Sequence, residues 1–188
     1  MNTTSLFVEL VVIGAGVITW VVLLAVALGG YPVASFGQGV LLASAIPVLA
    51  LVYVFGIVWD RLADTIFNRF WGCDLRARYY SDTGEYYRDR RAILISAPAL
   101  ADLLEYGRSR LRICRGWSLN ALLIAISLWL LLGLQTGLAN TAILLFASLA
   151  ALLLSLGCWF AWRNLTLTEY RKIKDQALYL SDSDSKPG

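Results

Sequence analysis

Arginine is the residue type in this sequence with the clearest capacity for binding chemistry. Eleven of the sixteen basic residues lie between Trp59 and Trp117, and all eleven are arginines. Guanidinium groups bind phosphates and carboxylates through paired hydrogen bonds. Arg108, Arg112 and Arg115 are spaced so that a helix places them on one face. The candidate residues for binding anions, lipids or a partner are Arg88, Arg90, Arg91, Arg108, Arg110, Arg112 and Arg115.

Three kinds of ligand fit these arginines: the headgroups of anionic membrane lipids, a phosphorylated small molecule such as a nucleotide, and an acidic cytosolic protein. A simpler interpretation is that the arginines only orient the chain in a membrane, because basic loops are retained in the cytoplasm. Each would then attract anionic lipid by about 1 kcal/mol. Specific nucleic-acid binding is not expected.

Catalysis is not expected either. The sequence contains no histidine, and Cys73, Cys114 and Cys158 match no zinc-binding spacing. No phosphate-binding glycine loop and no nucleophile beside a base is present. Asp60 and Asp64 are too few to hold a divalent cation, so ion pairs with the arginines are the preferred interpretation. We therefore predict no catalytic residue, no metal site and no cofactor.

Composition indicates an integral membrane protein. The chain has 188 residues, of which 59% are hydrophobic and 15% are charged. Four apolar runs, near 6–28, 39–58, 117–138 and 139–162, are long enough to cross a hydrocarbon core about 30 Å thick. The predicted fold class is all-α, with four transmembrane helices.

The distribution of charge predicts the topology. Every basic residue lies either between positions 61 and 115 or after position 162. By the positive-inside rule, both termini and the central polar segment are cytoplasmic, in a multi-pass protein of the cell inner (plasma) membrane. The predicted parts are membrane helices in 1–58, a cytoplasmic domain in 59–116, membrane helices in 117–162, an amphipathic cytoplasmic helix in 163–180 and a disordered tail in 181–188.

The central segment 59–116 predicts a folded, mainly helical domain, because it is much longer than a connection requires. The second span should continue as a helix until Gly72. Tyrosine pairs around a glycine favour a small β-hairpin over 76–88, with a helix over 85–94 as the alternative. From Pro98 one long helix should run into the third span.

Three polar residues inside or beside the apolar runs are candidates for lining a pore: Glu9, Asn120 and Gln135. A buried charge is costly in a membrane and therefore often functional. For Glu9 the simpler interpretation is a carboxylate that reaches the membrane interface or pairs with an arginine such as Arg115 or Arg163.

The remaining candidates concern helix shape and packing. Pro47, near the middle of the second run, predicts a kink that could act as a hinge. Small residues let neighbouring helix backbones approach closely and indicate helix packing. These small residues are Gly14, Gly16, Ala147, Ala151 and Ser155.

Two functions follow as hypotheses. The first is a homo-oligomeric channel or pore-forming effector, gated through the basic cytoplasmic domain, because small four-span subunits need several copies to enclose a path. The alternative is a membrane-anchored sensor or scaffold that recruits a cytosolic partner, for example in a bacterial stress or phage-defence system. Ion flux through reconstituted protein distinguishes the two.

Overall fold

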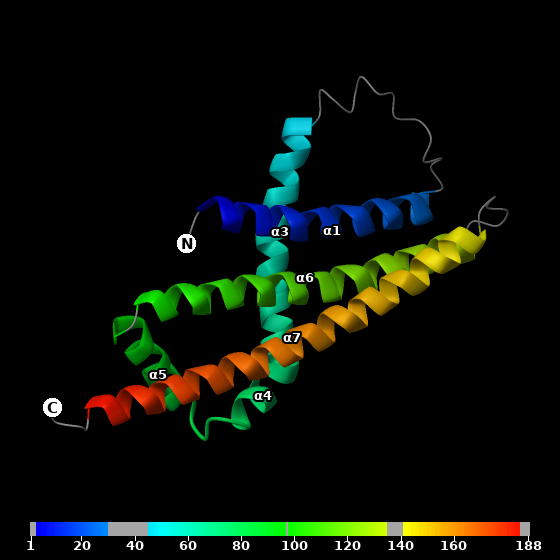
Figure 1. Cartoon of the computed structure of the whole chain (residues 1–188). Helices are drawn as coiled ribbons and strands as arrows, with labels where there is room; N and C mark the ends of the chain where they lie inside the picture. The colour runs from blue at the N-terminus through cyan, green and yellow to red at the C-terminus, as the bar shows by residue number, and fades with distance from the viewer. Residues whose placement is uncertain (1–2, 30–44, 97, 135–140, 185–188) are drawn as a thin grey trace.

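The computed structural model describes residues 3–29, 45–96, 98–134 and 141–184, and the regular elements in these ranges are helices (Figure 1). Four stretches are long and apolar enough to cross a membrane, in agreement with the four predicted spans. In chain order the elements are α1 (Thr3–Gly29), α3 (Ala45–Phe67), the π-helix η1 (Asn68–Gly72), α4 (Cys73–Ala77), α5 (Thr83–Ser96), α6 (Pro98–Leu134) and α7 (Thr141–Asp184).

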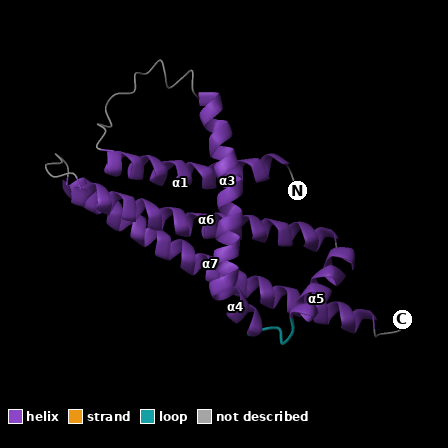
Figure 2. Cartoon of the chain, turned by 180° about the vertical axis from the view of Figure 1, so that it is seen from behind, coloured by secondary structure: helices purple, strands orange, loops and turns teal. Residues whose placement is uncertain are grey.

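The predicted β-hairpin over 76–88 is wrong, since the described residues contain no strand (Figure 2). Helix α4 ends at Ala77, and α5 covers the alternative helix over 85–94. The carbonyl oxygen of Arg76 accepts the N–H groups of both Tyr79 and Tyr80 at 3.0 Å, which closes a helical turn. Two of the tyrosines that suggested paired strands, Tyr80 and Tyr86, instead pack on Tyr170 of α7, and this tertiary contact outweighs strand propensity.

Gly72 does not end the second helical stretch. It adopts ordinary right-handed helical angles, φ −62° and ψ −39°. A glycine terminates a helix by taking a positive φ, which is absent here. The chain instead passes through one π-helical segment, η1, and continues as α4.

Two further predictions concern Pro47 and the C-terminal segment. Pro47 lies in the first turn of α3 as described, where its missing N–H interrupts no helical hydrogen bond. The described helix therefore gives no basis for a kink at this proline. At the other end of the chain, α7 extends to Asp184, into the segment 181–188 that was predicted to be disordered.

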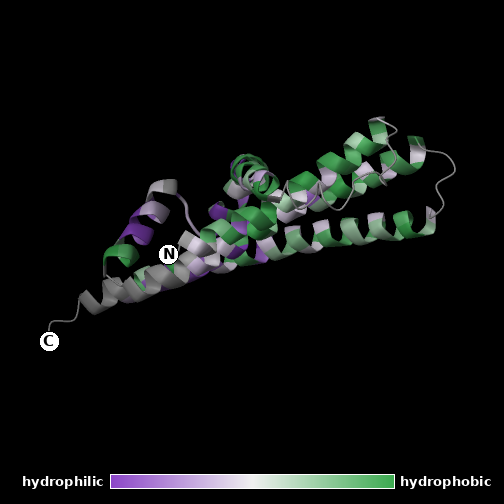
Figure 3. Ribbon diagram, turned by 90° about the horizontal axis from the view of Figure 1, so that it is seen from above, coloured by the Kyte–Doolittle hydropathy of each residue, from purple (hydrophilic) through white to green (hydrophobic). Residues whose placement is uncertain are grey.

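Helices α6 and α7 are long, as the sequence predicted. Helix α7 has 44 residues, and at 1.5 Å per residue it extends about 66 Å. A hydrocarbon core is only about 30 Å thick. Both helices therefore have an apolar part and a charged part, and Figure 3 shows hydrophilic residues gathered on α5 and the adjoining parts of α6 and α7. We call residues 59–96, 106–115 and 162–179 the basic end.

Helix α6 runs beside α1 and beside α7, and α3 crosses these helices steeply (Figures 1 and 3). Two glycines form the crossing with α1. A Cβ on Gly14 would lie 1.8 Å from the carbonyl oxygen of Val52, and one on Gly56 would lie 2.0 Å from that of Leu10. The two backbones are therefore in direct contact. Beyond the crossing, residues Ile46–Leu51 are all exposed.

Polar side chains join α6 to its neighbours inside the apolar part. Asn120 is fully buried, and its Nδ2 donates to the carbonyl oxygen of Ile13 at 2.9 Å. Gly16 leaves the space that this side chain occupies. Ser118 and Ser155 each donate to the other's backbone oxygen, at 3.2 and 2.8 Å. These hydrogen bonds set the register of α6 against α1 and α7.

Replacing Asn120 with leucine tests this register. Asn120→Leu keeps the number and branching of the heavy atoms but removes the hydrogen bond to α1, so we expect the free energy of unfolding to fall by about 1 kcal/mol, as for other hydrogen bonds between membrane helices. Thermal unfolding in detergent measures it. The matched control is Thr19→Val, because Thr19 is exposed and bonds only within its own helix, to Ala15. Equal stability of the two variants would contradict the assignment.

Candidate functional site: the arginine cavity

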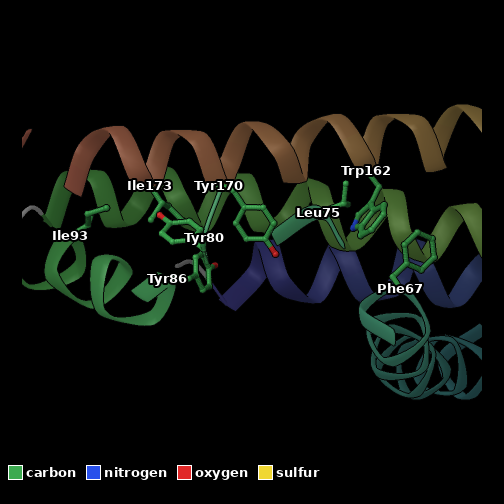
Figure 4. Packing of buried hydrophobic residues seen from close by; sticks show 8 residues of the cluster. All are labelled: Phe67, Leu75, Tyr80, Tyr86, Ile93, Trp162, Tyr170 and Ile173. Atoms are coloured by element: carbon green, nitrogen blue, oxygen red, sulfur yellow. The ribbon is translucent and has the colours of Figure 1, made fainter. Parts of the chain in front are cut away.

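Aromatic packing holds the basic end together. The Tyr86 ring lies 5.3 Å from that of Tyr170 and 5.4 Å from that of Tyr80. Phe67, at the end of α3, meets Trp162 edge-on at 4.5 Å. This packing attaches α3, α4 and α5 to one side of α7. The buried cluster comprises Phe67, Leu75, Tyr80, Tyr86, Ile93, Trp162, Tyr170 and Ile173 (Figure 4).

Polar contacts complete the attachment. The ammonium group of Lys174 donates to the carbonyl oxygen of Tyr79 at 2.6 Å and lies 5.5 Å from the centre of the Tyr80 ring. Burial raises the pKa of the Tyr86 hydroxyl, and the charge of Glu169 raises this pKa further. Tyr86 therefore stays a neutral hydroxyl at physiological pH and is able to donate a hydrogen bond.

A cavity of about 370 Å³ adjoins this cluster and lies between α3, η1, α4, α5, α6 and α7. Six arginines line it against three carboxylates, so its lining has an excess of three positive charges. The carboxylates are Asp60, Asp64 and Glu169. We call this site the arginine cavity, and its arginines are Arg61, Arg76, Arg90, Arg108, Arg112 and Arg115.

The structure brings four of the seven predicted binding arginines into this cavity: Arg90, Arg108, Arg112 and Arg115. The other three lie elsewhere. Arg110 lies over the ring of Tyr106 and faces Glu169 and Lys172 from a different groove. Arg88 and Arg91 line a shallow groove along α5 with Tyr87 and Ile95.

Among the arginines that line the cavity, the sequence analysis missed two, Arg61 and Arg76. Arg76 was assigned to a hairpin strand, which gave no reason to place it near α6. Arg61 lies at the start of the polar segment and was not among the candidate binding residues. A helix predicted to continue over 73–77 would have placed Arg76 on the same helix face as Asn68 and Gly72, which also line the cavity.

Two ion-pair groups connect the arginine cavity to the spans. In the first, Arg112 pairs with Glu9 of α1 at 3.6 Å, and Ser109 donates a hydrogen bond to the same carboxylate. Glu9 is buried. It is thus paired with an arginine, as the simpler interpretation proposed, although the partner is Arg112 rather than Arg115 or Arg163.

In the second group, Arg115 of α6 bridges two carboxylates of α3. Its guanidinium pairs with Asp60 at 3.3 Å and with Asp64 through a closer hydrogen bond. The side chain of Asp60 is 10% exposed, and that of Arg115 is 13% exposed. The two aspartates are therefore used in ion pairs, the preferred interpretation of the sequence. Within the residues that the structure describes, no three histidine, cysteine or acidic side chains gather as a metal site requires.

Two of the three pore-lining candidates are buried inside the subunit. Glu9 is engaged by α6 at the basic end, and Asn120 is buried between α1 and α6. Gln135 lies outside the described residues. Of the packing candidates, Gly14 meets α3, Gly16 meets Asn120, and Ser155 faces Ser118. Ala151 is buried near Ser155, and Ala147 is half-buried.

Fold and site together define a class: an all-helical protein with four potential membrane spans and an arginine-lined cavity at one end. No known protein family, characterised protein or solved structure matches this chain in sequence or fold.

Proposed function

We propose that this protein is a homo-oligomeric, multi-pass sensor of the inner (plasma) membrane. Its basic end and both termini are cytoplasmic, and binding of an anionic ligand or partner there changes the arrangement of the spans. The role is non-catalytic, and the output is recruitment of a cytosolic partner. Bacterial stress or phage-defence signalling would suit such a device.

One observation carries the proposal: two of the six arginines that line the cavity also hold the spans together. Arg112 ties α6 to α1, and Arg115 ties α6 to α3. An anion that attracts these guanidiniums competes directly with Glu9, Asp60 and Asp64. Ligand binding at the basic end therefore alters helix contacts through a differential interaction, which is what a ligand-driven switch requires.

The cytoplasmic placement of the basic end has support from charge and from geometry. The positive-inside rule places all its arginines on the cytoplasmic side. The beginning of α1 and the end of α7 also lie toward the same end of the molecule (Figure 1). Helix α3 crosses the other long helices steeply (Figure 1), so in the proposed topology its tilt is larger than the average of about 20° for spanning helices.

Topology is tested by cysteine labelling in a variant that lacks Cys73, Cys114 and Cys158. We expect Glu85→Cys and Ser185→Cys to react with an impermeant reagent from the cytoplasmic side only. Gln38→Cys, in the uncharged connection, is the control and should react from the opposite side. Labelling of positions 85 and 185 from opposite faces would remove the proposal.

A pore is the second candidate function. The observation that favours it is the exposed apolar segment Ile46–Leu51 of α3, which another copy would cover in an oligomer. Against it, Glu9 and Asn120 have partners inside the subunit, and a conducting path needs polar lining. Ion flux through proteoliposomes decides: the sensor predicts none above empty vesicles, with or without an anionic ligand, whereas a pore predicts flux.

A further inference from the structure

We propose that the arginine cavity binds a phosphate group carried by a soluble small molecule or by the headgroup of a membrane lipid. The inference rests on the proposed sensor role, since it names the chemistry of the ligand that the sensor receives. Phosphate is favoured because guanidinium groups bind its oxygens through forked, charge-assisted hydrogen bonds.

Apart from Arg61, which is exposed, three arginines of the cavity have no ion pair among the described residues. Arg112 and Arg115, in contrast, are paired with Glu9, Asp60 and Asp64, and a ligand held beside them competes with these carboxylates. For the described part of the chain, no carboxylate lies within ion-pair distance of Arg76, Arg90 or Arg108. These three come from α4, α5 and α6, so they approach the cavity from different sides. Such convergence suits a compact anion with several oxygens.

Arg76 provides a second observation. Its Nε is buried and has no hydrogen-bond acceptor among the described residues. The guanidinium lies over the Tyr86 ring, 5.6 Å from the ring centre, and interacts with the Tyr170 hydroxyl, which leaves Nε as its unsatisfied atom. A buried N–H group without an acceptor is unfavourable, and an oxyanion in the cavity would supply the missing acceptor.

Glu169 is the carboxylate that opposes the ligand. It lines the same cavity, and its charge acts on Arg90 and Arg108. A single carboxylate does not neutralise three guanidiniums, whereas a phosphate carries up to two negative charges. The side chain therefore weakens phosphate binding without abolishing it, and its removal should strengthen binding.

The volume of the cavity further restricts which phosphate-containing ligands fit. Its volume of about 370 Å³ lies within the range of about 300–1,000 Å³ that is typical of small-molecule sites. Such a space is larger than a phosphate needs. The organic part of a phosphate ester would lie against Tyr87 and Tyr170, which also line it. A recessed site between six elements suits such a compound better than the flat surface of a protein partner.

The test uses the full chain in phosphatidylcholine nanodiscs, with inorganic pyrophosphate titrated by calorimetry. We expect saturable binding that Arg90→Gln and Arg108→Gln each weaken about tenfold or more, because each removes a charge-assisted hydrogen bond. Glu169→Gln should tighten binding. The matched control is Arg91→Gln, since Arg91 adjoins Arg90 on α5 but lies outside the arginine cavity.

A lipid source of the phosphate is tested with the same variants. Native mass spectrometry counts the phosphatidylglycerol retained by protein taken from nanodiscs that contain this lipid. Retention lost in Arg90→Gln and Arg108→Gln, but kept in Arg91→Gln, assigns the site to a headgroup. The same pattern confined to pyrophosphate assigns it to a soluble ligand.

Equal behaviour of the Arg90, Arg108 and Arg91 variants in both measurements would overturn the phosphate site. That failure is separable from failure of the sensor role, because cysteine labelling at positions 85 and 185 tests the topology independently. If phosphate binds as expected but cysteine labelling shows the opposite topology, the phosphate site stands and the proposed function is wrong.

Discussion

Replacing Gly14 with alanine is expected to separate α1 from α3 and to destabilise the protein by about 3 kcal/mol or more. The added methyl group would lie 1.8 Å from the backbone oxygen of Val52, far inside van der Waals contact. Overpacking ordinarily costs about 1–3 kcal/mol when side chains yield. Here the obstacle is backbone, so a helix has to move. Unfolding in detergent, followed by circular dichroism, measures the loss.

Gly56→Ala should have a similar effect, since its methyl group would meet the backbone of Leu10. The double variant should cost less than the sum, because either change alone already breaks the same contact. Gly133 and Gly157 provide matched controls, as open space surrounds both positions within their helices. Alanine at either should stabilise by about 0.5–1 kcal/mol through helix propensity. Destabilisation by all four substitutions alike would show that close approach is not the cause.

Replacing Arg115 with glutamine is expected to have the second large effect. It should lower the free energy of unfolding by about 3–5 kcal/mol. The change leaves Asp60, whose side chain is 10% exposed, without its cation. Loss of one partner from a buried ion pair is costly because the remaining charge stays desolvated. Arg115→Lys should restore only part of the loss, since an ammonium group lacks the planar fork that reaches Asp60 and Asp64 together.

A second-site change distinguishes a buried charge from a general packing defect. In the Arg115→Gln background, Asp60→Asn removes the unpaired charge and should recover much of the stability. The control is Arg171→Gln, which breaks the pair with Asp175 at 3.8 Å on α7, where both side chains are mostly exposed. Its effect should stay below about 1 kcal/mol. No recovery in the double variant would mean that Arg115 acts through packing.

Much of the architecture was predictable because it depends on local sequence. Apolar runs of about 20 residues specify spanning helices whatever surrounds them. The absence of strong breakers between Pro98 and the third span predicted one long helix, and α6 is that helix. The same local reasoning failed over 76–88, where strand and helix propensities are close and the packing of Tyr80 and Tyr86 on Tyr170 decides.

The arginine cavity was predictable only in part, because sequence shows which charges exist but not which of them meet. Four of its arginines were candidates, yet the inclusion of Arg61 and Arg76 depends on how α3 and α4 approach α6. Arg88 and Arg91 lie outside the arginine cavity because of the face that α5 turns toward α7.

The sequence by itself determined four apolar helices, one concentration of arginines and the side of the membrane on which those arginines are expected. These properties follow from composition along the chain and from the cost of placing charge in lipid. Only the tertiary structure decided that Glu9 pairs with Arg112, that Arg115 bridges Asp60 and Asp64, and that Gly14 meets Gly56. Contacts between residues distant in the chain depend on how whole helices pack, and no local pattern encodes that packing.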